Sequence, residues 1–207
     1  SEMCIRDRVD PVMGELLNFR FKDGSLKGHS LGNLFLAALN ETSSSFDEAV
    51  KKFSHLTGVV GTVYPVTNES VTLSALLEDG RLIEGESHIG VHHDGPKNGI
   101  VKLMVNPEKP KAVDGVIKAL EKADIIVLGP GSLYTSIIPN LLVDGVVDAI
   151  KKSNAVKIYV CNIMSQAGET ENYTVSDHLA AIERHSYEGI ADIVLSLIHI
   201  SEPTRLA

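Results

Sequence analysis

This sequence has little cysteine, no excess of basic residues and no long apolar run. Two cysteines occur among 207 residues, lysine and arginine (19) are outnumbered by aspartate and glutamate (27), and the formal net charge is −8. An acidic surface repels a phosphate backbone, so nucleic acid is not expected as a partner. No apolar run approaches the roughly 20 residues that span a bilayer, and no signal-peptide pattern is recognisable. We therefore expect a soluble cytoplasmic protein that binds no membrane.

The two ends of the chain are related at the level of DNA. SEMCIRDR, residues 1–8, can be encoded by a string whose reverse complement encodes LSLIHIS followed by Asp or Glu, which is the sequence from Leu195 to Glu202. This relation resembles a translated sequencing adapter, so residues 1–8 and 195–207 are set aside as adapter-like and residues 9–194 are expected to form a partial domain. Cys4 is set aside with them. Cys161 then remains alone, which excludes a disulfide framework and a cysteine-based metal site.

The second half of the chain alternates between helix-like and strand-like segments. Helical patterns are predicted at 111–123, from Pro139 to 153 and at 174–186, the last with a capping box of Thr174 and Asp177. Apolar strands are predicted at 124–128, 156–164 and 191–195. Strand–helix alternation with short connections is typical of a parallel, doubly wound sheet. The sequence therefore predicts an α/β fold that is Rossmann-like, with a largely parallel, doubly wound sheet.

The first half has a different pattern. Two helices are predicted at 31–39 and 43–58, the second with a capping box of Ser45 and Glu48. The segment 59–107 is predicted to be mostly antiparallel, with a hairpin at Asp79-Gly80. The expected fold is thus an incomplete α/β domain with an inserted antiparallel hairpin region.

The stretch IVLGPGSLYTS, residues 126–136, places two glycines, a proline and several hydroxyl groups directly after a strand. Ligands of open parallel sheets bind beyond the carboxyl ends of the strands, and a second polar loop, CNIMSQAGETENYT at 161–174, follows the next strand. Gly129 and Gly131 would let the backbone approach an anion, and the hydroxyl groups and the following helix would stabilise it. The stretch is neither a Walker A loop nor a dinucleotide fingerprint, since Tyr134 stands where the third glycine should be. Taken alone, it fits a structural turn as well as a phosphate loop.

Several other polar residues have simpler interpretations. SHIGVHHDG, residues 87–95, holds three histidines and an aspartate, but they surround a Gly-Pro loop, so a solvated tip is favoured and no metal ligand is assigned. His178 and His185 share a helix face that has no carboxylate-rich partner helix. Cys161 follows an apolar strand and is expected to be buried rather than to act as a nucleophile.

Three long stretches, GHSLGNLFLAAL, ADIIVLGPGSLYTSIIPNLLV and CNIMSQAGETENYTVSDHL, resemble in this order the gluconeogenesis-factor (YvcK-like) branch of the 2-phospho-L-lactate transferase (CofD-like) family. The resemblance extends from Val9 to about Val194. It implies a Rossmann-like fold and, for this branch, binding of a UDP-sugar such as UDP-GlcNAc, with roles in bacterial carbon metabolism and cell shape. The enzyme branch transfers a phospholactyl group from a nucleotide-activated donor to a deazaflavin. That transfer, with a divalent metal, is the alternative function. A purely structural or scaffolding protein with an empty cleft is a third possibility.

The resemblance also implies ligand contacts. The turn at 129–136 would lie beside the nucleotide diphosphate, and Tyr173 in the second loop would contact the base or sugar. The start of the first helix would approach the same cleft, although His29 and Ser30 fit plain helix-cap roles as well. The family's glycine-rich first loop precedes residue 9 in relatives, so the cleft is expected to be partly encoded. We expect a binding protein rather than an enzyme; no catalytic residue is assigned, no cofactor beyond the UDP-sugar is implied, and a homodimer is left open. The implied ligand-binding residues are Gly129, Gly131, Ser132, Leu133, Tyr134, Thr135, Ser136, Asn162, Glu169, Thr170, Tyr173, His29, Ser30 and Asn33.

Overall fold

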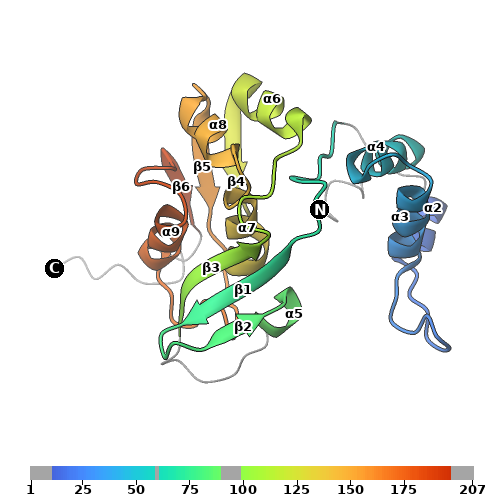
Figure 1. The fold of residues 1–207 in the computed structure, drawn as a ribbon, viewed down its shortest axis with the longest axis horizontal. Coiled ribbons are helices and arrows are strands. Elements are labelled where there is room, and N and C mark those ends of the chain that lie inside the picture. The colour runs from blue at the N-terminus through green and yellow to red at the C-terminus, as the bar shows by residue number, and fades with distance from the viewer. Residues whose placement is uncertain (1–10, 59–60, 90–98, 197–207) are drawn as a thin grey trace. The chain divides into compact units, whose positions relative to one another are not determined.

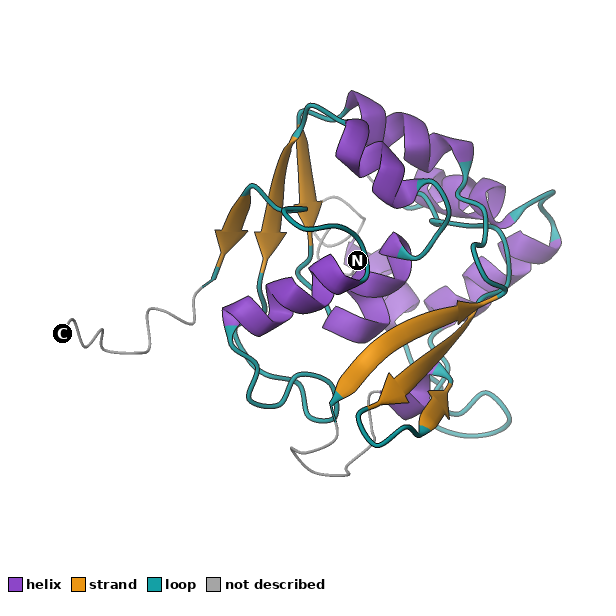
Figure 2. Ribbon diagram, turned by 60° about the vertical axis from the view of Figure 1, so that its left-hand side comes forward, coloured by secondary structure: helices purple, strands orange, loops and turns teal. Residues whose placement is uncertain are grey.

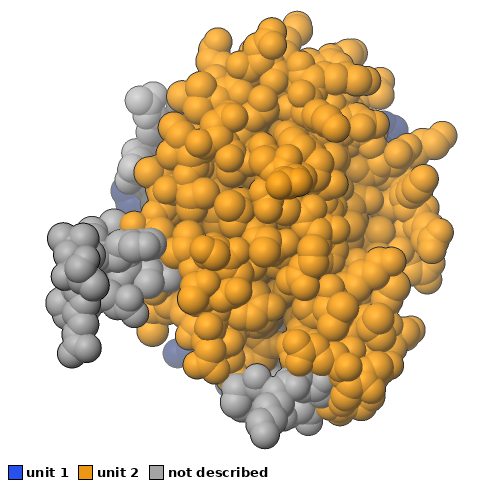
Figure 3. Space-filling model, turned by 90° about the vertical axis from the view of Figure 1, so that its left-hand side faces the viewer, with its two compact units in different colours: residues 1–68 blue, residues 69–207 orange. Residues whose placement is uncertain are grey.

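The computed structural model of the chain describes residues 11–58, 61–89 and 99–196, which fall into two compact units (Figure 1). Unit 1 comprises residues 1–68 and unit 2 residues 69–207, as the colours of Figure 3 indicate. No helix within the described ranges has the length and apolar character needed to cross a membrane.

Unit 1 is helical, as the sequence predicts. Ser45 accepts a hydrogen bond from the Glu48 N–H (3.4 Å) and so caps the third helix, whereas the Glu48 carboxylate bonds to Ser44 instead of completing the box with Ser45. Gly32 lets two helices approach, because a Cβ at this position would lie 2.9 Å from the Leu17 carbonyl oxygen. The helices are α2 (Pro11–Asn18), α3 (Leu31–Glu41) and α4 (Phe46–Leu56).

Unit 2 contains two three-stranded sheets, one antiparallel in the order β2-β1-β3 and one parallel in the order β4-β5-β6 (Figure 2). This confirms the predicted α/β class, the hairpin at Asp79-Gly80 and the three successive parallel strands. Residues 61–67 form no strand, so the antiparallel region is shorter than expected. The strands are β1 (Thr72–Leu77), β2 (Leu82–Glu84), β3 (Ile100–Asn106), β4 (Ile125–Leu128), β5 (Val156–Val160) and β6 (Ile193–Leu195).

The helices of unit 2 differ from the prediction at two places. The single helix predicted from Pro139 to 153 is interrupted at residues 142–145, between two short helices. A helical segment was expected only after Pro139, but it begins at Leu133 with a π-helical turn. Pro139 lies in the first turn of the α-helix that follows, where its missing N–H is tolerated. The predicted capping box of Thr174 and Asp177 is confirmed in both halves. The helices are α5 (Glu86–Ile89), α6 (Asp114–Lys122), η1 (Leu133–Ile137), α7 (Ile138–Leu141), α8 (Val146–Lys152) and α9 (Val175–Arg184).

The two faces of the parallel sheet are covered unequally. Ile126, Leu128 and Tyr159 are buried on one face, whereas on the other Ile125 is 58% exposed and Val127 53%. Parallel sheets are normally covered on both faces, because their connections place helices there. In the described part of the chain, one apolar face of this sheet therefore contributes little buried area.

This asymmetry predicts unequal costs for the same kind of substitution at neighbouring positions. Val127→Thr should change the free energy of unfolding by less than about 0.5 kcal/mol, because the side chain is already exposed. Ile126→Thr should cost about 1–3 kcal/mol, because it removes buried hydrocarbon and buries a hydroxyl. Urea unfolding followed by circular dichroism measures both. Equal losses of unfolding free energy in the two variants would mean that the sheet face containing Val127 is covered in solution.

His185, at the end of α9, joins this helix to the edge strand β3. The Leu103 N–H donates to His185 Nε2 (2.8 Å), so Nε2 must carry a lone pair, and the ring proton lies on Nδ1, 2.7 Å from the Ala181 carbonyl oxygen. Burial lowers the pKa of His185, and the cations of Arg184 and Lys102 lower it further, against the opposite effect of the bond to Ala181. The neutral ring is therefore the form that holds α9 and β3 together.

The His185 contact gives folding stability a defined pH dependence. Because the pKa is lowered on folding, the unfolded chain binds the proton more readily; the stabilisation is complete above the ordinary histidine value of about 6.5 and is lost as pH falls through the lower folded-state value. We expect the wild type to lose about 1 kcal/mol more than His185→Gln between about pH 7.5 and 5, since an amide oxygen accepts the Leu103 N–H without titrating. Urea midpoints at the two pH values measure the difference. Equal losses of unfolding free energy in the wild type and in His185→Gln would contradict the neutral ring assigned to His185.

Candidate functional site

The two loops that the sequence singles out begin side by side at one edge of the parallel sheet. β4 and β5 are adjacent and parallel, with Leu128 in register with Tyr159. The turn at 129–136 and the loop at 161–173 therefore leave the sheet at the same edge. This is the edge beyond which ligands bind in open α/β sheets.

The glycines of the turn have a structural reason. Gly129 has φ +88°, and a Cβ there would lie 2.8 Å from the Val160 carbonyl oxygen. A Cβ on Gly131 would come within 3.3 Å of Ser136 Cβ. These close approaches let the turn pack against the end of β5 and against the helix that follows. Chain geometry alone thus requires Gly129.

Side-chain amides fasten the turn to the second loop. Asn162 bonds to both backbone groups of Gly131: its Nδ2 donates to the Gly131 carbonyl oxygen (2.8 Å), and its Oδ1 accepts from the Gly131 N–H (3.3 Å). The Ser132 hydroxyl donates to Gln166 Oε1 (2.8 Å). Two of the groups expected to face a diphosphate are therefore already hydrogen-bonded to the neighbouring loop.

A buried carboxylate completes this junction. Glu169 is 3% exposed; its Oε2 accepts from the Tyr134 N–H (3.1 Å), and its Oε1 accepts from the Thr135 hydroxyl (3.2 Å) and Gln166 Nε2 (3.0 Å). Neither the turn nor the loop contains lysine or arginine, so neutral donors and the start of a helical segment stabilise the charge. Glu169 thus occupies donors that would otherwise be open to an anion.

Aromatic rings lie beneath the turn. Tyr134 is completely buried; its hydroxyl donates to the Ile100 carbonyl oxygen (3.1 Å) and lies 2.9 Å from the Tyr173 hydroxyl. Burial, and then the bond to Tyr173, raise the pKa of Tyr134 well above its usual range. The His178 ring stands edge-to-face against Tyr173, 5.4 Å between centroids. Its Nδ1 bonds to the Thr174 carbonyl oxygen (2.9 Å), and its buried Nε2 has no hydrogen-bond partner within the described residues.

The remaining residues of the predicted site have varied surroundings. The Leu133 side chain is buried with Tyr134, so the two could meet a ligand only through their backbone. The buried Thr170 hydroxyl accepts from the Gln166 N–H (2.9 Å), and Ser136 is exposed. Gln166, which the sequence analysis did not assign, contacts both the turn and Glu169. The signal for it was available: an amide side chain in a loop at the carboxyl end of a parallel strand.

Three predicted site residues belong to unit 1. Ser30 caps α3 by accepting from the Asn33 N–H (3.2 Å), which is the plain cap role that the sequence left open. Asn33 is exposed, and His29 immediately precedes the cap. Their approach to a ligand stays a prediction.

No group of three or more metal-ligating side chains occurs within the described residues, and most of the 87–95 histidine cluster lies outside them. His88 Nδ1 bonds to the Glu84 carbonyl oxygen (2.8 Å). Cys161 is buried, as expected, and burial raises the pKa of its thiol. A raised pKa favours the unreactive thiol over the nucleophilic thiolate.

Comparison with known proteins identifies one family. The family model described as 2-phospho-L-lactate transferase CofD matches residues 3–205. The gluconeogenesis factor of Halalkalibacterium halodurans is 45% identical over 190 residues, which is 90% of this chain and 57% of that protein. The gluconeogenesis factor of Bacillus subtilis is 43% identical over 190 residues, 90% of this chain and 58% of that protein. The chain spans about half the length of the curated relatives it matches.

A solved structure agrees with the fold. The crystal structure of a member of the UPF0052 family from Bacillus halodurans superposes with a TM-score of 0.87 at 43% identity, covering 95% of this chain and 62% of that one. The likeness in fold and in sequence therefore covers nearly the whole chain.

The junction at Glu169 predicts a contrast between two acidic neighbours. Glu169→Ala should lower the free energy of unfolding by about 2–4 kcal/mol, because it leaves the buried Tyr134 N–H and the Thr135 hydroxyl without acceptors. Glu171→Ala, two residues away on the exposed surface, removes the same formal charge and should cost less than about 0.5 kcal/mol. Urea unfolding of both variants tests the contrast. A loss of similar size for both would show that the junction does not stabilise the protein.

Proposed function

The chain belongs to the 2-phospho-L-lactate transferase (CofD) family, and we propose that it binds a UDP-sugar as part of a cytoplasmic gluconeogenesis factor that regulates carbon metabolism. The relatives named gluconeogenesis factor support this role, since they match nearly all of the chain at 38–45% identity. On this proposal the protein senses a nucleotide-sugar and does not consume it.

One observation carries the proposal: two loops rich in hydrogen-bonding groups lie together at the carboxyl edge of a parallel sheet. The diphosphate would lie along the turn at 129–136, where the hydroxyls of Ser132 and Thr135 would exchange their bonds to Gln166 and Glu169 for bonds to phosphate oxygens. The sugar or base would be held by the loop at 162–173. The exposed Ser136 hydroxyl would add a further donor.

The alternative is a transferase that moves a phospholactyl-type group from a nucleotide donor to a deazaflavin. The description of the matching family model is consistent with this alternative, since it names a transferase, but it does not favour it. Titration calorimetry with UDP-N-acetylglucosamine and with a guanosine-linked lactyl donor separates the two functions. Binding of the UDP-sugar without turnover supports the sensor; transfer to a deazaflavin would replace it.

The phosphate role of the turn is tested by removing its hydroxyl donors. Ser132→Ala together with Thr135→Ala should weaken UDP-sugar binding by about 1–3 kcal/mol, because charge-assisted bonds to the diphosphate are lost. Ser165→Ala is the control, since Ser165 is an exposed hydroxyl of the second loop outside the predicted contacts. Calorimetry measures all three proteins. Unchanged affinity in the double variant would discard the phosphate role.

A further inference from the structure

A separate hollow lies in unit 2, between β3 and the segment that links α7 to α8. Its volume is about 420 Å³, within the range of small-ligand sites. Lys102, Leu103, Met104 and Val105 line one side, and residues 141–145, 147 and 148 line the other. None of these residues belongs to the two loops of the proposed nucleotide-sugar site.

The lining shows that the hollow lies along the edge of β3. Successive side chains of a strand point to opposite faces of the sheet, so a hollow on one face would be lined by alternate residues. Here four consecutive residues, 102–105, take part. Among the residues that the structure describes, β3 is also an edge strand, with β1 as its one neighbour in the sheet.

The outward edge of β3 is already capped by side chains at two positions. The Tyr134 hydroxyl donates to the Ile100 carbonyl oxygen, and His185 Nε2 accepts from the Leu103 N–H. These groups act where a neighbouring strand would pair. Capping of this kind is one way in which proteins protect an open edge.

Val105 is the next outward position. In an antiparallel ladder, the residues that face the partner alternate with residues that face away, so Val105 points outward as Leu103 does. The register partner of Val105 on β1 is Leu73, and its backbone supports this orientation. The Leu73 carbonyl oxygen accepts from the Gly85 N–H on the β2 side and not from β3. The backbone N–H and carbonyl of Val105 therefore face the hollow.

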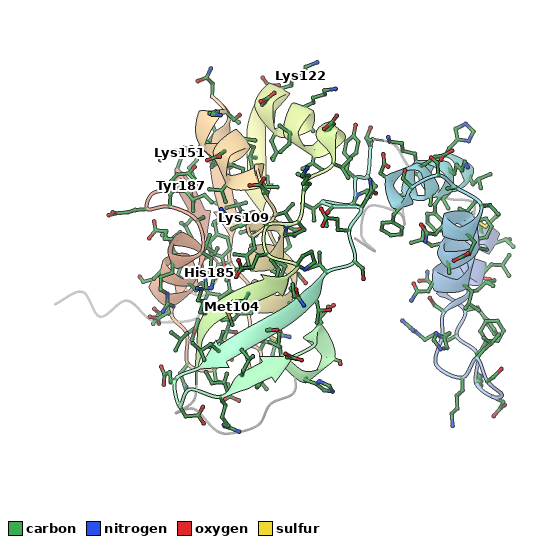
Figure 4. The ribbon with its side chains drawn as sticks, in the orientation of Figure 1. Met104, Lys109, Lys122, Lys151, His185 and Tyr187 are labelled. Atoms are coloured by element: carbon green, nitrogen blue, oxygen red, sulfur yellow. The ribbon has the colours of Figure 1, made fainter. Side chains whose placement is uncertain are left out.

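The walls of the hollow combine apolar and charged groups. Leu142 and Val147 are partly exposed and apolar. Lys102, Glu108 and Lys109 lie on the strand side; Figure 4 labels Met104 and Lys109, which both line the hollow.

Two carboxylates, of Asp144 and Asp148, lie on the opposite side of the hollow. The ion pairs found in the described residues involve none of the five charged side chains that line the hollow. The rim thus offers unpaired charges of both signs.

We propose that an extended peptide segment of a partner protein binds in this hollow by pairing with the edge of β3 at Val105. Main-chain hydrogen bonds to Val105 would supply affinity, as in other cases of strand addition. Alternate apolar side chains of the peptide would contact Leu142 and Val147. The intervening side chains would be acidic and basic, matching the charges of both signs on the rim.

The test uses the full chain and a fluorescein-labelled, C-terminally amidated heptapeptide in which valine alternates with glutamate and lysine. Fluorescence anisotropy should show saturable binding. Val105→Pro should weaken it at least tenfold, because proline lacks the outward N–H while the bonds to β1 come from the neighbouring residues. Val105→Thr keeps the N–H and should stay within about twofold.

A second pair of measurements guards against misfolding of the proline variant. Val147→Arg fills the hollow from the helix side without changing β3 and should also weaken binding at least fivefold, as should N-methylation of the central valine of the peptide. Absence of saturable binding to the wild type would overturn the proposal. So would equal affinity of the wild type, Val147→Arg and the N-methylated peptide, whatever the fate of Val105→Pro.

Discussion

The buried carboxylate of Glu169 is the contact on which the geometry of the sheet edge depends. A carboxyl group with 3% exposure needs hydrogen-bond partners, and three groups donate to it: the Tyr134 N–H, the Thr135 hydroxyl and the Gln166 amide. Because these donors come from loops that follow different strands, neither loop can move without exposing unsatisfied polar groups. The same junction fixes Tyr134, whose hydroxyl reaches β3 at Ile100. One acidic residue thereby connects the parallel sheet to the antiparallel one.

On the proposed function, this internal bonding limits how tightly a nucleotide-sugar binds. The hydroxyls of Ser132 and Thr135 already donate to Gln166 and Glu169, so a ligand exchanges one set of hydrogen bonds for another. The net gain of such an exchange is small compared with the strength of each bond. A negative carboxylate nearby also opposes a diphosphate. A site of this kind suits a sensor that must release its ligand when the concentration falls.

The elements that the sequence predicted are those determined by residues close together along the chain. The hairpin follows from Asp79-Gly80, the start of α9 from Thr174 and Asp177, and the parallel strands from short apolar runs between helical patterns. The contacts that it missed join distant residues: Glu169 bonds to groups 34 and 35 positions earlier, and His185 pairs with a strand 82 positions away. Gly129 shows the limit most clearly. Its sequence context fits an anion loop and a structural turn equally, and only the 2.8 Å approach to the Val160 carbonyl oxygen reveals the structural requirement.

The edge of β3 connects the two proposed sites physically. Its outward backbone groups have different surroundings along the strand. Tyr134 bonds to the Ile100 carbonyl oxygen, His185 bonds to the Leu103 N–H, and the backbone groups of Val105 face the hollow. Tyr134 also carries the backbone N–H that Glu169 holds, so displacement of Glu169 by a ligand would loosen the residue that anchors β3. A strand that pairs at Val105 would favour one position of that edge. Two ligands that act on the same element change each other's affinity, and the coupling must be equal in both directions. Coupling between nucleotide-sugar and peptide would thus arise from Tyr134 and β3, without direct contact between the ligands.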